Sequence, residues 1–157
     1  MILGMYIVVM LILMLLLIYR YNPLHPAEAF FYFMVTSIIG LECTLDLSLN
    51  IELIKISPEV PKALSFIINV IFLEPILIVG FLKMVVSVQS MWKKLGYFLF
   101  FYVVLCGSVM LMEHLEIIKF AQWQPWMSCI YWVVLLLISL ALCKGYRHLL
   151  KKAGIQL

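Results

Sequence analysis

Acidic side chains inside long apolar stretches are the residues of this sequence that could do chemistry. Glu74 lies near the middle of the apolar stretch 63–86, directly before Pro75. A charge at the centre of a membrane span costs roughly 2.5–3.5 kcal/mol on insertion scales, and proline leaves the carbonyl four residues earlier, that of Ile71, without its helical donor. A carboxyl beside a free carbonyl could bind a proton, a cation or water; alternatively, Glu74 only hydrogen-bonds a neighbouring helix.

Two further acidic groups lie at the ends of apolar stretches. Glu42 and Asp46 are four residues apart, and Glu113, His114 and Glu116 lie within one turn. Residues three or four apart share a helix face, and like charges held close together favour a shared cation or proton. With the mid-span carboxyl, these five residues form our candidate ion- or ligand-binding set. Acidic residues also gather near the expected outer face, as a mouth that would concentrate cations: Glu42, Asp46, Glu52, Glu59, Glu113 and Glu116.

Catalytic and metal-binding motifs are missing. The sequence contains no HExxH, GxSxG, Walker or GxGxxG pattern. The three histidines fall at different span ends, so His114 with its neighbouring acids is a weak zinc site. The four cysteines have no CxxC spacing and suit helix packing. We expect no catalytic residue, no metal and no cofactor.

Composition requires a membrane as the solvent. The 157 residues are 66% hydrophobic and 12% charged, against roughly 45–50% and 25% in soluble domains. A soluble protein of this size could not bury so much apolar surface. The net charge of +3 does not indicate nucleic-acid binding, because the basic residues flank apolar stretches. We predict a single-domain, all-α integral membrane protein whose principal partner is the lipid bilayer.

Five stretches are long and apolar enough to span a bilayer. They are residues 2–19, 27–47, 63–86, 95–112 and 126–143. We therefore predict a bundle of five transmembrane helices.

Basic residues give the expected orientation. One side receives eight of them, against three on the other, so the positive-inside rule places the N-terminus outside and the C-terminus in the cytoplasm. The basic tail 144–157 is either a plain stop-transfer anchor or a segment that lies on anionic lipid. The eight residues are Arg20, Lys83, Lys93, Lys94, Lys144, Arg147, Lys151 and Lys152.

One segment departs from the helical pattern. From Leu45 to Leu53 apolar and polar residues alternate strictly. A helix would scatter the apolar groups, whereas an extended chain places them on one face. We expect an extended outer-face loop at 48–62 that covers the end of the bundle with its apolar face turned inward, with or without a ligand beneath it.

Small residues mark places where helices could pack closely. Thr36 and Gly40 lie on one face of the second stretch, and Gly107 and Ser108 form a small patch on the fourth. Small side chains let helices approach each other in lipid. We expect contacts within a homo-oligomer or with other membrane subunits at such faces.

The sequence resembles a family of small multi-spanning membrane proteins common in spore-forming Gram-positive bacteria. The resemblance rests on DLSLNIEL, PEV, a span with a central proline, Glu113 late in its span and QWQPWMS before the last span. The family has no catalytic signature, and it implies a helical bundle in the bacterial plasma membrane. An aromatic residue is expected before the central proline, where this chain has Glu74.

Three functions remain open. The first is a non-catalytic accessory subunit, scaffold or sensor that acts through helix–helix contacts. The second is a small oligomeric transporter or channel for protons or cations that uses Glu74 and the acidic outer mouth. The third is a membrane enzyme acting on lipid. We expect the first, because catalytic motifs are missing and the loops are short.

Overall fold

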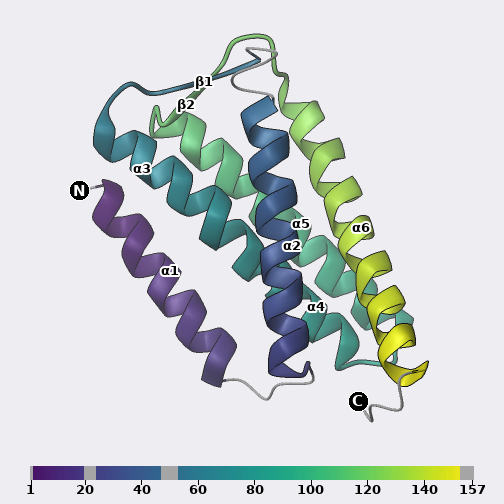
Figure 1. Cartoon of the computed structure of the whole chain (residues 1–157). Helices are drawn as coiled ribbons and strands as arrows, with labels where there is room; N and C mark the ends of the chain where they lie inside the picture. Colours follow the sequence, from purple (N-terminus) through teal and green to yellow (C-terminus); the bar gives the residue numbers. More distant parts are fainter. Residues whose placement is uncertain (1, 20–23, 47–52, 153–157) are drawn as a thin grey trace.

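The protein is a bundle of long helices closed at one end by a small two-stranded sheet (Figure 1). The structure, a computed structural model, describes residues 2–19, 24–46 and 53–152. The predicted all-α bundle is confirmed. The elements are α1 (Ile2–Tyr19), α2 (Pro26–Leu45), β1 (Ile54–Ile56), α3 (Val60–Ile68), η2 (Asn69–Leu73), α4 (Glu74–Val86), α5 (Met91–His114), β2 (Ile118–Phe120) and α6 (Pro125–Lys152).

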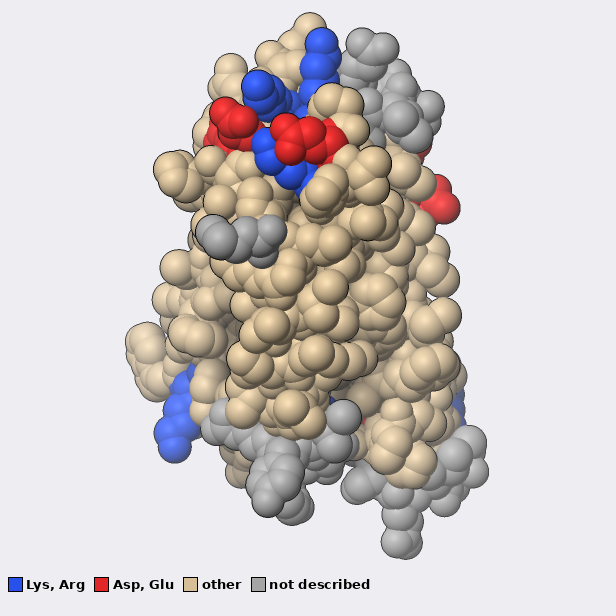
Figure 2. All heavy atoms as spheres, turned by 90° about the vertical axis from the view of Figure 1, so that its left-hand side faces the viewer, with Lys and Arg blue, Asp and Glu red and all other residues tan. Residues whose placement is uncertain are grey.

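Four helices in the described chain are long and apolar enough to cross a membrane. They are α2, α5, α6 and the continuous stretch Val60–Val86 formed by α3, η2 and α4. Helix α1 is apolar but shorter, and its 18 residues reach about 27 Å at 1.5 Å per residue. Figure 2 shows charged side chains gathered towards the two ends of one face, with an uncharged band between them. Helix α6 continues to Lys152, so the expected tail begins as helix.

A single π-helical turn breaks the regular pattern of the Val60–Val86 stretch. Pro75 has no N–H, so the carbonyl of Ile71 loses its helical donor. The backbone N–H of Glu74 instead reaches the carbonyl of Asn69, which defines η2. Ser37 of α2 donates its hydroxyl to the Ile71 carbonyl at 3.0 Å. The carbonyl that Pro75 was predicted to free thus accepts a hydrogen bond from a side chain on another helix.

The sheet, which we call the cap, joins the two loops at one end of the bundle. Strands β1 and β2 are antiparallel, with Lys55 opposite Lys119. Ile54 and Ile118 are buried in a cluster with residues of α1, η2 and α5. Of the expected inward face, Leu45 is still helical, which corrects the prediction there, whereas Leu53 packs against this cluster as expected. Residues 47–52 lie outside the described residues.

The chain enters β2 through a sharp turn at the end of α5. Glu116 adopts the left-handed conformation, with φ of 54°. The N–H of Glu116 bonds the carbonyl of Glu113, and the N–H of Ile117 bonds that of Met112. This pair of bonds is the Schellman arrangement, in which a left-handed residue ends a helix. The turn leaves Ile117 and Ile118 fully buried beneath the cap.

Candidate functional site

The carboxyl of Glu74 lies inside the bundle, where the π-helical turn meets α2. It is 5% exposed, and its Oε1 accepts a hydrogen bond from Asn69 Nδ2 at 2.8 Å. Helix α2 passes close by at Gly40, where a Cβ atom would lie 3.9 Å from Glu74 Oε2 and from the Val70 carbonyl oxygen. The π-helical turn therefore brings Asn69 and Glu74 together, and the small residue on α2 leaves room for the carboxyl.

A cavity of about 50 Å³ lies between this carboxyl and the cap. Trp132 and Tyr131 of α6 line it together with Glu74, and Ile54 and Ile118 of the cap line it from above. A buried carboxyl beside such a cavity can accept hydrogen bonds or exchange a proton with a small polar molecule.

The other acidic candidates lie on the surface rather than with Glu74. Glu42, Asp46, Glu113 and His114 are all exposed. Glu116 is also exposed, and its Oε2 lies 3.7 Å from Lys62 Nζ, which in turn contacts Glu59 at 3.1 Å. Within the described ranges, no group of three or more His, Cys, Asp and Glu side chains could hold a metal ion. The expected acidic residues therefore form no single site with Glu74.

The residues predicted to pack helices have different environments. Gly40 lies in a close helix contact. Thr36 is buried, and its hydroxyl bonds the Tyr32 carbonyl of its own helix at 2.7 Å. Ser108 does the same with Leu105 at 2.8 Å. Gly107 is exposed, with open space where its Cβ would be. Thr36 and Gly40 on α2 are therefore buried, whereas Gly107 on α5 is exposed.

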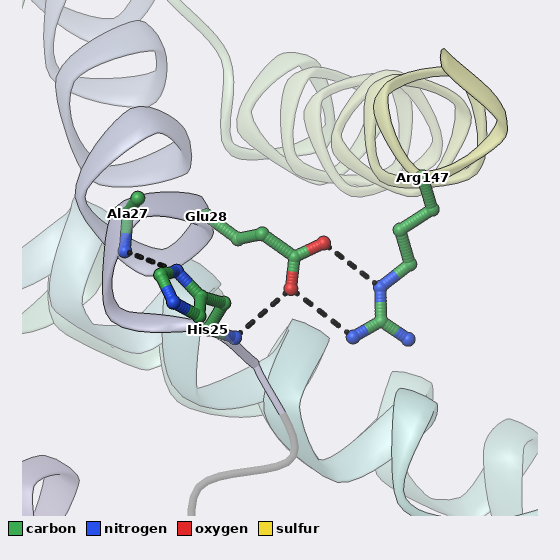
Figure 3. Close-up of polar contacts among 4 residues, drawn as sticks. All are labelled: His25, Ala27, Glu28 and Arg147. Atoms are coloured by element: carbon green, nitrogen blue, oxygen red, sulfur yellow. Dashed lines mark hydrogen bonds and ion pairs between the residues drawn. The ribbon is translucent and has the colours of Figure 1, made fainter. Parts of the chain in front are cut away.

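Sequence reasoning missed an ion pair at the opposite end of the bundle. Glu28 is 1% exposed, and its carboxylate accepts Arg147 Nε at 3.1 Å and Nη2 at 3.2 Å (Figure 3). The backbone N–H of His25 also donates to Glu28, while His25 Nδ1 accepts from Ala27 N–H. His25 and Glu28 have the spacing of a capping box, which was the one available local signal. Arg147, predicted as part of a basic tail that is a stop-transfer anchor or a lipid-binding segment, instead points towards Glu28 of α2.

A second basic residue at this end also points inward. The ammonium of Lys83 donates to the Leu17 carbonyl at 2.6 Å, near the end of α1. A cation suits the C-terminal end of a helix, where carbonyls lack partners. Lys83 therefore fastens α1 to α4.

Comparison with known proteins gives no further guide: no protein family, curated protein or solved structure matches the chain. Function is therefore inferred from the geometry.

Proposed function

We propose that this protein is a non-catalytic multi-pass membrane protein that acts as an accessory subunit, scaffold or sensor through helix–helix contacts, with α5 as its contact surface. The resemblance to a bacterial family favours a plasma-membrane location, and the charge bias favours an outside N-terminus. The observation that carries the proposal is the exposure of α5: 17% of its apolar window is buried within the protein, against 61% for the Val60–Val86 span.

The exposed residues of α5 repeat at a regular spacing. Gly96, Phe100, Val103, Gly107 and Met110 follow one another at intervals of four, three, four and three, and all are exposed. This heptad spacing suits packing against another helix. Both glycines face open space, so they leave hollows on either side of the two large side chains. We call this row the α5 seam. Small residues of this kind are typical of helix contacts in lipid.

A photo-crosslinking residue at Val103 tests this proposal. We expect one discrete protein adduct in native membranes, with a second copy of this chain or with another membrane subunit, and its mass distinguishes the two. A crosslinker at Val8, an exposed apolar position of α1, is the control and should label lipid. Gly107→Leu should abolish the Val103 adduct while leaving the bundle folded. Lipid adducts alone at Val103 would rule the proposal out.

Proton or cation transport is the second candidate, and the buried Glu74 carboxyl beside a cavity favours it. Proteoliposomes containing the wild type should then carry proton or cation flux that Glu74→Gln abolishes. Equal flux in the two proteins, or none above empty liposomes, would remove this candidate. The described residues supply no geometry that favours the lipid-active enzyme.

A further inference from the structure

The cavity beside Glu74 has the size and lining of a water site. Its volume is about 50 Å³, and a buried water needs roughly 10–15 Å³ on this measure, so about three to five waters would fit. The polar lining includes Glu74, Thr44 and Ser128, together with Tyr131 and Trp132. A buried water also needs two to four polar partners, and this lining supplies them.

Two buried polar atoms of the lining residues have no partner. Tyr131 Oη and Trp132 Nε1 are buried and make no hydrogen bond within the described structure. The whole Trp132 side chain is 1% exposed. A buried donor left without an acceptor costs about 1–3 kcal/mol. Water in the cavity beside both residues would supply acceptors.

Glu74 has the complementary shortage. A carboxylate offers about four acceptor positions, and Asn69 is its one hydrogen-bond donor among the described side chains. Among the described residues, no Lys, Arg or His side chain forms an ion pair with Glu74. The cavity thus brings donors that lack acceptors and a carboxyl that lacks donors to one space.

We propose that water fills this cavity and joins Glu74 to Tyr131 and Trp132, which makes Glu74 a hydrated proton-binding site inside the membrane. When Glu74 takes up a proton, hydronium transfers it to a carboxylate oxygen. An O–H bond forms on Glu74, and a water molecule remains. A metal cation is disfavoured, because the indole of Trp132 offers an N–H donor and no lone pair. The site is independent of the α5 seam, and it supplies the protonatable group that the transport candidate requires.

Radiolytic hydroxyl-radical footprinting of the purified chain in nanodiscs tests this proposal, because bound water labels buried neighbouring side chains. We expect label on Trp132 and none on Tyr32, a control that is also 1% exposed and has a buried hydroxyl, but packs against Phe31 and Tyr146 instead of lining the cavity. Labelling of Trp132 no higher than that of Tyr32 would overturn the proposal.

A cavity-filling variant identifies the source of the label. Val109 lines the cavity from α5 and carries no polar atom, so Val109→Phe should reduce Trp132 labelling to the level of Tyr32. Undiminished labelling in the folded variant would mean that the label comes from bulk solvent and would also overturn the proposal. If Val109→Phe does not fold, the comparison of Trp132 with Tyr32 in the wild type still decides. Absence of flux through Glu74, by contrast, would remove only the transport candidate.

Discussion

Arg147 and Glu28 lie 119 residues apart in the sequence and form an ion pair in which two guanidinium nitrogens meet two carboxylate oxygens. The contact fastens the end of α6 to the first turn of α2. Phe31 and Tyr146 stack beside it, with ring centroids 4.6 Å apart. Polar and aromatic contacts therefore close this end of the bundle together.

Removing one partner of this pair should destabilise the bundle strongly. Arg147→Met would leave the Glu28 carboxylate buried, and an unpaired buried charge of this kind costs about 3–5 kcal/mol. We expect the lower end of that range, because 23% of the Arg147 side chain is exposed. Reversible unfolding in mixed micelles measures the loss. The double variant Glu28→Leu/Arg147→Met should lose less than the sum of the single variants; simple additivity would contradict the pairing.

Gly40 should tolerate one methyl group but no larger side chain. A Cβ atom there would meet Val70 and Glu74 at 3.9–4.0 Å, an ordinary contact distance, so Gly40→Ala should stay within about 1 kcal/mol of the wild type. Gly40→Leu should overpack this helix contact and lose about 1–3 kcal/mol. Thermal unfolding compares the two. Gly4→Leu, which enters open space on α1, is the matched control, and an equal loss there would refute the steric argument.

Reversing one charge across the cap should stabilise it. Lys55 and Lys119 are opposite each other in the register, and like charges in this position are unfavourable. Lys55→Glu should therefore gain about 0.2–1 kcal/mol, as an opposite pair does. Hydrogen exchange of the β1 and β2 amides reports the change. The double variant Lys55→Glu/Lys119→Glu restores like charges and should lose the gain; if it remains, the effect does not come from this pair.

Glycine at position 116 should also increase stability. The left-handed conformation of Glu116 costs an L-residue about 1–2 kcal/mol, a cost glycine does not incur. The substitution also removes the ion pair between Glu116 and Lys62, but an exposed pair of this kind contributes only about 0–1 kcal/mol. We expect Glu116→Gly to raise the melting temperature. Glu113→Gly, inside α5, should lower the melting temperature, because glycine in a helix costs about 1 kcal/mol of stability. Lower melting temperatures in both variants would show that position 116 is not strained.

Local sequence patterns predicted the features that depend on neighbouring residues. Long apolar stretches predicted the membrane-spanning helices, because a backbone in lipid must satisfy its hydrogen bonds within one segment. Pro75 predicted the free carbonyl of Ile71, because proline always removes the same donor. The alternation up to Leu53 predicted an extended segment with its apolar face turned inward, and Leu53 packs inward. It did not predict the pairing of β1 with β2, because β2 lies far along the chain.

By itself, the sequence determined the solvent, the helices and the break at Pro75, because apolar length and a missing N–H act locally. Tertiary structure alone decided which partners meet. It brought Ser37 to the Ile71 carbonyl, Arg147 to Glu28, and Trp132 to the cavity beside Glu74. These contacts join different helices, and the packing of one helix surface on another sets their geometry, which no spacing within one segment specifies.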